Sequence, residues 1–466
     1  MERILCFITI LAILVGTLAL SGCGAKDKPA DALINGVHLS EYAIVYGEDS
    51  LDYDKRAAEY IRDEVKARTN IELAILTDAG EVRAHEIVIG DTDRPISDRL
   101  DAECEGLEFA ILADGAHIAL EGEYFIIAAA AYYFIDKFVP GGDSSTTVPA
   151  GIEIHEPITK KANNLILLIG DGMGLNHTKI FDYREDELEY SDGEDFFYGE
   201  FLPYHGYSRT ASLSGVTDSA AGGTALSAGY KTYNEFIGRD KDGNNVKLIT
   251  ELAAELGKAT AVMSTESNTG ATPSTFSAHV DNRDSSGAIS QSQLATMQKY
   301  GTVIDCGYDY YNKRMINNSV EKHINDTLAK IGADPDGFFL MYEEAHIDKH
   351  SHNNDIDKLY QAVVRFNQAI GRIMEYAFYH PDTMVLITAD HETGDLRDVD
   401  GVLTYHSEEH TLTDVPVFAW GEGGELFDGQ TVENIQIAHT LASLMGVYDF
   451  GDQSEFSYLK GEGSEG

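Results

Sequence analysis

The sequence predicts an α/β protein in which a small α/β domain precedes a largely parallel sheet sandwiched by helices. Strand-like segments alternate with helical spacing along the chain. The apolar segments of the second part show no polar alternation, which is typical of strands buried on both faces of a parallel sheet. The length of 466 residues, 43% of them hydrophobic, exceeds the about 100–250 residues of one domain. We therefore expect two domains.

The first residues predict an export signal. Residues 1–22 hold Arg3 and then an apolar stretch, as a secretory leader does. Leu-Ser-Gly before Cys23 resembles a bacterial lipobox. Acylation of Cys23 would then anchor the mature chain to the cell membrane on its extracytoplasmic side, with residues 23–33 as a polar tether. A retained membrane helix is the alternative interpretation.

A small α/β domain is expected over residues 34–150. It opens in a βαβ-like way, and a hairpin that turns at Asp114-Gly115 precedes an apolar helix. The expected strands are Tyr42–Tyr46, Glu72–Leu76, Glu86–Ile89, Glu108–Leu112 and His117–Leu120, and the helices contain Ala57, Ala58, Ile61 and Val65 or span Phe125–Phe138. Through AAEYIRDEVKARTNIEL, EIVIGDT and AAAAYYFIDKF, the domain resembles the accessory N-terminal domain of secreted glycoside hydrolases. A spacer role and a glycan contact are both open.

Residues 160–455 carry the apolar segments of the predicted parallel sheet. The strands expected there are Leu165–Ile169, Ala259–Met263, Phe338–Tyr342, Met384–Thr388 and Val415–Trp420. In such sheets, ligands bind beyond the carboxyl ends of the strands. Polar residues close to these strand ends are therefore the candidates for chemistry.

The charge excludes one class of partner. With 34 Lys and Arg against 78 Asp and Glu, the formal net charge is −44, which repels phosphates and argues against nucleic-acid binding. Most of these carboxylates are expected to form a solvated surface. Outside the leader and Cys23, only Cys104 and Cys306 remain, so we expect free thiols rather than a disulfide framework.

Acidic and imidazole side chains gather in four groups near the apolar strands of the second domain. Asp348 and His352 are four residues apart, so one helical turn would place both on one face. Mixed Asp and His ligands favour zinc, whereas oxygen ligands alone favour magnesium. A single histidine is most often structural, but the four groups together favour a metal centre. The residues are Asp171, Glu343, Asp348, His352, Asp390, His391 and His410.

Two further motifs could act on a phosphoryl group. Ser219 lies in a run of small residues, TDSAAGGTAL, that leads into a predicted helix. A serine there can simply cap the helix, but beside a metal its hydroxyl ionises more readily and becomes a nucleophile. Farther along, Thr272 and Arg283 lie in ATPSTFSAHVDNR. A guanidinium can bind two phosphoryl oxygens, whereas a surface arginine is the ordinary alternative.

Together these segments resemble the alkaline phosphatase family. IGDGMG, VTDSAAGGTAL, ATPSTFSAHVDNR, EEAHIDKHSH, ITADHETG and EEHT followed by DVPVFAWG occur in the family's order over residues 163–450. The resemblance implies an alkaline phosphatase-like fold. It also implies hydrolysis of phosphomonoesters through a phosphoserine intermediate, with release of inorganic phosphate. Members of the family are often dimers, so a homodimer is compatible with the resemblance.

The resemblance implies a role for each motif residue. Ser219 would be the nucleophile, and Arg283 would clamp two phosphoryl oxygens with Asp218 orienting it. Lys349 would assist phosphate through a water molecule. Two zinc ions and one magnesium ion are implied. One zinc would be held by Asp348, His352 and His410, the second zinc by Asp171, Asp390 and His391, and the magnesium by Asp171, Thr272 and Glu343.

Two departures from the family pattern matter. Gly270 stands two residues before Thr272, where better-known members carry an Asp or His near the magnesium site, so the occupancy and identity of that metal are open. The segment from His391 to His410 is short and leaves little room for the surface domain that many relatives insert. Two alternative functions are a phosphodiesterase of the same superfamily and a non-catalytic metal- or glycan-binding surface lipoprotein.

Overall fold

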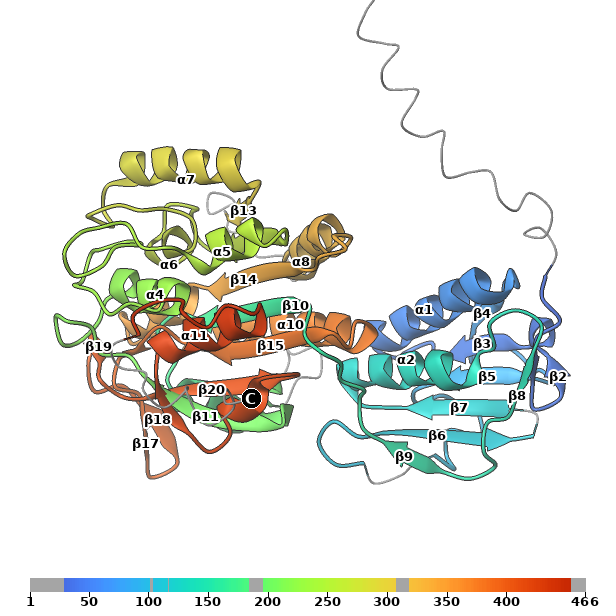
Figure 1. Ribbon diagram of the computed structural model, residues 1–466. Coiled ribbons are helices and arrows are strands. Elements are labelled where there is room, and N and C mark those ends of the chain that lie inside the picture. Colours follow the sequence, from blue (N-terminus) through green and yellow to red (C-terminus); the bar gives the residue numbers. More distant parts are fainter. Residues whose placement is uncertain (1–28, 101–103, 116, 184–195, 307–317, 454–466) are drawn as a thin grey trace, which may run out of the picture. The chain divides into compact units, whose positions relative to one another are not determined.

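A computed structural model describes residues 29–100, 104–115, 117–183, 196–306 and 318–453 (Figure 1). The chain divides into two compact units, residues 1–157 and 158–466. The expected leader and Cys23 lie outside the described residues. Within the described ranges, no helix is both long and apolar enough to cross a bilayer. Cys104 and Cys306 are free thiols, as expected.

The first unit is built on a mixed sheet whose described strands follow the order β4-β3-β5-β7-β6-β9. β3, β4, β5 and β7 are parallel, whereas β6 runs antiparallel to β7 and β9. The predicted βαβ opening and the hairpin at Asp114-Gly115 are confirmed. The strand expected from Glu72 begins at Ala74, because the register pairs Ala74 with Ala43 at the start of β3. The bounds are Ala43–Tyr46 (β3), Ala74–Thr77 (β4), Glu86–Ile89 (β5), Phe109–Asp114 (β6), His117–Glu121 (β7) and Glu153–His155 (β9), and a separate small sheet joins Leu33–Ile34 (β1), Val37–His38 (β2) and Ser145–Thr146 (β8).

Two helices pack on this sheet and on each other, α1 (Asp52–Thr69) and α2 (Ile127–Phe138). The four α1 side chains that were expected to share one face are fully buried: Ala57, Ala58, Ile61 and Val65. Their spacing of three and four residues directs them toward the strands. α1 ends at Asn70, whose φ of 58° is the left-handed conformation that commonly stops a helix.

The second unit contains the larger sheet, whose described strands follow the order β13-β12-β14-β10-β15-β20-β11-β21. The strands from β13 to β15 are parallel, whereas β20 is antiparallel to β15 and β11 is antiparallel to β20. The prediction of a largely parallel sheet is therefore confirmed, with Val415–Trp420 as an antiparallel strand. The bounds are Asn164–Gly170 (β10), Tyr204–Arg209 (β11), Ala259–Ser264 (β12), Val303–Cys306 (β13), Phe338–Glu344 (β14), Thr383–Thr388 (β15), Val415–Trp420 (β20) and Thr431–Glu433 (β21).

Helices cover both faces of this sheet, as β14 shows. Phe339 and Met341 belong to the core shared with α5 and α11, whereas Tyr342 stacks on Phe366 of α10, with ring centroids 6.4 Å apart. Because both faces are buried, the strand is apolar almost throughout. The principal helices are Leu175–Thr178 (α3), Ser219–Ala228 (α4), Ile249–Glu255 (α5), Ala271–Thr275 (α6), Ser286–Tyr300 (α7), Asn318–Ile331 (α8), His346–Ser351 (α9), Ile356–Tyr379 (α10) and Ile435–Leu444 (α11).

The carboxyl ends of the central strands lie level with one another. β10 lies between β14 and β15, and the register pairs Gly170 with Glu344 and Ile169 with Thr388. Because β20 is antiparallel to β15, the segment between them leaves and returns at this same edge. That segment holds the antiparallel pair β16 (Glu392–Thr393) and β19 (His410–Thr411) and the hairpin of β17 (Arg397–Val399) and β18 (Val402–Thr404).

Candidate metal centre

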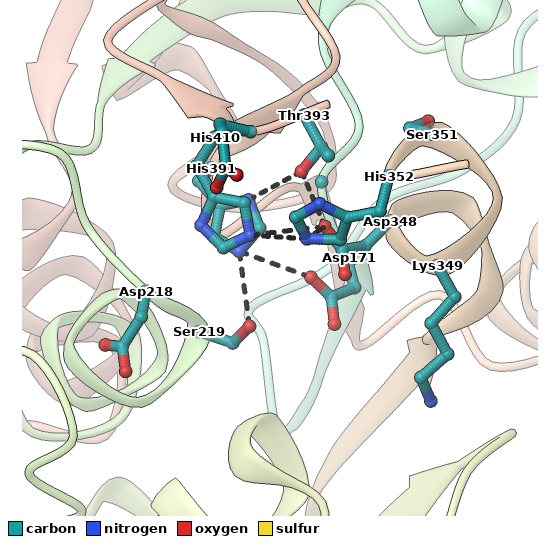
Figure 2. A network of polar contacts seen from close by, with 12 residues as sticks. Asp171, Asp218, Ser219, Asp348, Lys349, Ser351, His352, His391, Thr393 and His410 are labelled. Atoms are coloured by element: carbon teal, nitrogen blue, oxygen red, sulfur yellow. Dashed lines mark hydrogen bonds and ion pairs between the residues drawn. The ribbon is translucent and has the colours of Figure 1, made fainter. Parts of the chain in front are cut away.

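The four predicted groups of acidic and imidazole side chains meet beyond the carboxyl edge of the large sheet (Figure 2). Asp171 directly follows β10, and Asp390 and His391 follow β15. Asp348 lies in α9, the helix after β14, and His410 returns in β19. The parallel register of the strands thus brings together side chains that are more than 200 residues apart in the chain.

One cluster joins Asp348, His352 and His410. The Nε2 atoms of the two histidines are 3.1 Å apart and lie 3.3 and 3.4 Å from Asp348 Oδ1. His352 follows Asp348 by one turn at the end of α9, which confirms the expected shared face. One carboxylate oxygen and two imidazole nitrogens that converge in this way offer a donor set that zinc prefers.

Backbone carbonyls hold the outer ring nitrogens of these histidines. Nδ1 of His352 bonds to the carbonyl of Glu408, and Nδ1 of His410 bonds to the carbonyl of Thr217 at 2.8 Å. Because a carbonyl only accepts hydrogen bonds, each Nδ1 carries the proton and donates it. Each Nε2 therefore presents its lone pair to the cluster, which is the usual way a chain orients metal-binding imidazoles.

A second cluster centres on His391, whose Nε2 lies 3.4 Å from both Asp171 Oδ1 and Asp390 Oδ2 and 3.2 Å from Ser219 Oγ. Asp348 borders this cluster too, because ligand atoms of Asp171, Asp348 and His391 lie within 4.8 Å of one another. Asp348 therefore lies between the two clusters, a position that its motif did not indicate.

Thr393 connects the two clusters and was not anticipated. Its Oγ1 donates to Asp348 Oδ1 at 2.6 Å, so it is an acceptor for His391 Nδ1 at 3.2 Å. This hydroxyl orients the His391 ring in the way that the carbonyls orient the other two. The only sequence signal was its place two residues after His391 on a short strand.

Buried polar atoms test whether cations fit the site. Asp171 Oδ1 and Asp390 Oδ2 are buried and accept no hydrogen bond. A buried carboxylate without a partner is costly, and a divalent cation between such groups removes that cost. The orphaned oxygens and the mixed Asp/His donors therefore fit zinc at both clusters.

The pKa values of these residues follow from burial and crowding. Burial raises the pKa of Asp171 well above its usual range, with the Asp390 charge adding to the effect. Burial also raises the pKa of Asp390 to about 6. For Asp348, burial is outweighed by the imidazoles of His410, His391 and His352, which stabilise the carboxylate when they are protonated, so the pKa is lowered. Burial, assisted by His410, lowers the pKa of His391 and keeps its Nε2 unprotonated.

Ser219 is the first residue of α4, and Asp218 caps the helix. Asp218 Oδ1 accepts a hydrogen bond from the amide of Ala221 at 2.9 Å, so the interpretation of Ser219 as a mere cap is wrong. The Ser219 hydroxyl instead faces the second cluster (Figure 2). Gly222 permits the close approach of the helix, because a Cβ there would lie 2.8 Å from the carbonyl oxygen of Asp390.

Arg283 lies beside Ser219 through its contact with Asp218. Its Nη1 donates to Asp218 Oδ2 at 3.3 Å, and that oxygen also accepts from the amide of Glu235. Burial opposes the charge of Arg283, but Asp218 and Asp171 outweigh it and raise the arginine's pKa. The side chain is 33% exposed. The Arg283 guanidinium is therefore held at the site and stays partly accessible to solvent, rather than lying free on the surface.

The residues predicted for magnesium form a third set, made of oxygen atoms. Thr272 in α6 and Glu343 in β14 are fully buried, and Ser264 donates to Glu343 Oε2. Thr272 Oγ1 and Glu343 Oε1 form no hydrogen bond of regular geometry, although the Thr272 hydroxyl acts on the Glu343 carboxylate. Burial raises the pKa of Glu343, and the charge of Glu266 adds to it. The charge of Glu343 also acts on Asp171. Oxygen atoms in this arrangement fit magnesium.

Lys349 forms an ion pair with Glu266, which was not among the predicted site residues. Nζ of Lys349 lies 2.5 Å from Glu266 Oε2, and its amine points away from the contacts around the histidines (Figure 2). Burial opposes the charge of Lys349, but Glu266, Glu343 and Asp171 raise its pKa. Glu266 follows β12, so its place after a strand was the signal that could have identified it.

Comparison with known proteins places these motifs in one family. The family model for alkaline phosphatase matches residues 162–305 and 304–399. Alkaline phosphatase 3 of Bacillus subtilis (strain 168) is 31% identical over 299 residues, which cover 53% of this chain and 64% of that protein. The alkaline phosphatase of Escherichia coli (strain K12) is 36% identical over 162 residues, or 34% of each chain. The chain thus spans less than two thirds of these relatives.

Solved structures agree with the predicted fold. The alkaline phosphatase from the Antarctic bacterium TAB5 has a TM-score of 0.55 and 27% identity, and the match covers 63% of this chain and 99% of that one. A mutant of that enzyme, with the same score, has magnesium bound in its M3 site. The predicted α/β class with an alkaline phosphatase-like sheet is therefore confirmed. The family match begins at residue 162 and leaves the first unit unassigned.

Proposed function

The chain belongs to the alkaline phosphatase family, and on that premise we propose that it hydrolyses phosphate monoesters and releases inorganic phosphate. The placement of Ser219 carries the proposal. Its Oγ lies 3.2 Å from His391 Nε2, at the start of a helix whose cap, Asp218, holds Arg283. A nucleophile, a metal-binding imidazole and a phosphate-binding guanidinium thus share one site.

We propose zinc at the two Asp/His clusters and magnesium at the third set. Support comes from the converging ligand atoms and the orphaned buried oxygens, and from the magnesium-bound mutant of the TAB5 enzyme. When bound, the cations would stabilise negative charge on the attacking and leaving oxygens of the phosphoryl group. The proposed holders are Asp348, His352 and His410, then Asp171, Asp390 and His391 for zinc, and Asp171, Thr272 and Glu343 for magnesium.

Ser219 is proposed to attack the phosphorus atom. The bond from its Oγ to phosphorus forms as the bond to the ester oxygen breaks, and the proton that the serine hydroxyl gives up ends on that oxygen, which leaves as the alcohol. Water then hydrolyses the phosphoserine, which restores the hydroxyl and releases phosphate. Ser219 begins α4, so the positive end of a ten-residue helix also faces the phosphoryl oxygens.

Arg283 supports a preference for monoesters. A planar guanidinium binds two oxygens at once. A monoester then keeps a third terminal oxygen for the cations, whereas a diester, with two terminal oxygens, has none left. Asp218 holds one Nη atom of Arg283, and the exposed third of the side chain leaves other donors for the substrate. Lys349 is proposed to act on phosphate through a water molecule, from its place beside Glu266.

We also propose an extracytoplasmic location, with the chain anchored to the cell membrane through lipidated Cys23. Support comes from the leader-like residues 1–22 and the lipobox-like sequence alone. A homodimer and a glycan contact of the first unit remain predictions.

Hydrolysis of two chromogenic esters tests the proposed function. Residues 24–466 would be purified with zinc and magnesium, and p-nitrophenyl phosphate compared with bis-p-nitrophenyl phosphate at alkaline pH, with and without a chelator. We expect fast, chelator-sensitive cleavage of the monoester. Faster cleavage of the diester would indicate a phosphodiesterase, and no cleavage by the metal-loaded protein would contradict an enzymatic role.

A further inference from the structure

Glu266 fills the space that a side chain at position 270 would need. A Cβ built on Gly270 would lie 1.8 Å from Glu266 Oε1 and 2.2 Å from Glu266 Cδ, far closer than two non-bonded atoms can approach. A carboxylate carried by residue 266 therefore stands where a side chain on residue 270 would begin. Any larger residue at position 270 would displace Glu266.

The surrounding backbone ties Glu266 to the third set of oxygen atoms. Its amide donates to Ser264 Oγ at 3.0 Å, and that hydroxyl donates to Glu343 Oε2. Ser264 and Glu343 are also register partners on β12 and β14. Gly270, beside the Glu266 carboxylate, is the cap of α6, whose second residue is Thr272. The carboxylates of residues 266 and 343 and the Thr272 hydroxyl thus border one small region.

Two buried atoms in this region independently point to a ligand. Thr272 Oγ1 and Glu343 Oε1 are on fully buried side chains that act on each other but form no hydrogen bond of regular geometry. They come from a helix and a strand that are separate from the loop of Glu266. Both are hard oxygen donors, which suit magnesium better than zinc.

We propose that Glu266 supplies to the third metal site the carboxylate that Gly270 cannot. The inference rests on the proposed function, which places magnesium beside Glu343 and Thr272. Glycine at position 270 then leaves room for Glu266, which reaches the site from four residues earlier in the chain. Within this one loop, the Glu266 carboxylate takes the place of the side chain that the family pattern has at position 270.

The ion pair with Lys349 offers the competing explanation, in which Glu266 only holds the lysine. The two explanations differ in what removal of the lysine charge does. If Glu266 is a ligand, Lys349→Met leaves magnesium affinity unchanged or raises it, because a competing cation is gone. If Glu266 acts only through Lys349, the same variant weakens magnesium binding as much as Glu266→Gln does.

Calorimetric titration of magnesium chloride into the zinc-loaded chain of residues 24–466 tests the proposal. We expect Glu266→Gln to weaken magnesium binding by about tenfold or more, with zinc content unchanged. The double variant Glu266→Ala/Gly270→Asp should bind magnesium more tightly than Glu266→Ala alone, because alanine vacates the space beside position 270 and the aspartate restores a carboxylate. Glu251→Gln is the matched control: its side chain is 12% exposed against 19% for Glu266, and it pairs with His279.

Three outcomes would overturn the proposal: wild-type affinity in Glu266→Gln, an equal loss in Lys349→Met, or no magnesium binding by the zinc-loaded wild type. If Glu266→Gln fails to fold, Glu266→Asp provides the same test, since its shorter reach should also weaken binding. Hydrolysis of p-nitrophenyl phosphate is measured separately. Glu266-dependent magnesium binding without hydrolysis would refute the proposed function and leave this inference standing.

Discussion

His352 and His410 face each other through their Nε2 atoms, 3.1 Å apart. Both Nδ1 atoms donate to backbone carbonyls, so both Nε2 atoms present lone pairs. Two lone pairs at this separation repel each other unless a cation or a proton lies between them. Asp348 Oδ1 lies within 3.4 Å of both nitrogens, which favours a cation. The two imidazoles and Asp348 are thus already placed to bind a cation in the absence of substrate.

Removal of one of these imidazoles should empty the zinc site proposed at the first cluster. We expect His410→Ala to weaken zinc binding there by about 100-fold or more, because a direct ligand is lost as well as the contact with Asp348. Zinc content by mass spectrometry of the metal-loaded protein measures this. His406→Ala is the control, since that histidine is exposed in the same connecting segment. Equal zinc content in the two variants would contradict the assignment.

Ser219→Ala should abolish hydrolysis and leave the fold and zinc content intact. We expect a fall in kcat on the order of 10³-fold or more, as for other nucleophile deletions. The helix should survive because Asp218, and not Ser219, provides its cap. Ser227→Ala, on the same helix and also buried, should keep wild-type turnover. Wild-type turnover in Ser219→Ala would refute the nucleophile.

Zinc retention should fall as the pH is lowered through about 6. Protons compete with the cation for each ligand, and burial raises the pKa of Asp390 to about 6. For His410, burial is outweighed by Asp348 and the Thr217 carbonyl, which stabilise the protonated ring, so its pKa is raised too. Both groups therefore take up protons at a higher pH than usual. Dialysis against a fixed chelator concentration at stepped pH measures the midpoint, and a midpoint near pH 4 would contradict the expectation.

Thr393→Val should weaken zinc binding although Thr393 is not a proposed ligand. The substitution removes the hydroxyl that donates to Asp348 and accepts from His391, so both ligands lose their orientation. Partners of this kind typically contribute about 10–100-fold to metal affinity. Competition with a zinc-sensitive dye measures the change. Thr404→Val, in the β17–β18 hairpin, should bind zinc as the wild type does.

Gly222→Ala should impair catalysis by moving the nucleophile. The new Cβ would lie 2.8 Å from the carbonyl oxygen of Asp390, so α4 and Ser219 must shift. We expect lower kcat with little change in KM, and a loss of about 1–3 kcal/mol in the free energy of unfolding from overpacking. Gly287→Ala is the control, because nothing lies within 4 Å of its Cβ position. Similar effects of the two variants would show that packing at Gly222 is unimportant.

Most of the large sheet could be predicted because its strands are buried on both faces. β14 packs Phe339 against one layer and Tyr342 against the other, so its residues from Phe338 to Tyr342 are all apolar or aromatic. The direction of β20 could not be predicted in the same way. A strand covered on both faces has the same composition whether it runs parallel or antiparallel to its neighbour.

The candidate site was predictable where residues follow strands within a recognisable motif, as Asp171 and Asp390 do. Thr393 and Glu266 were not predicted, because their importance depends on tertiary contacts. Thr393 reaches Asp348 across 45 residues, and Glu266 matters because of an empty Cβ position at Gly270. Neither relation leaves a pattern of spacing or composition along the chain.

The segment between the antiparallel strands β15 and β20 has two parts: a stem in which β16 pairs with β19, and a tip formed by the β17–β18 hairpin. In the stem, β16 pairs with β19 and sets Thr393 opposite His410. At the tip, Val399 and Val402 are 43% and 61% exposed. An insertion at residues 399–402 would therefore lengthen this hairpin without altering the β16–β19 pairing that positions Thr393 and His410. The connection between β15 and β20 can thus vary in length while the candidate metal-binding residues keep their places.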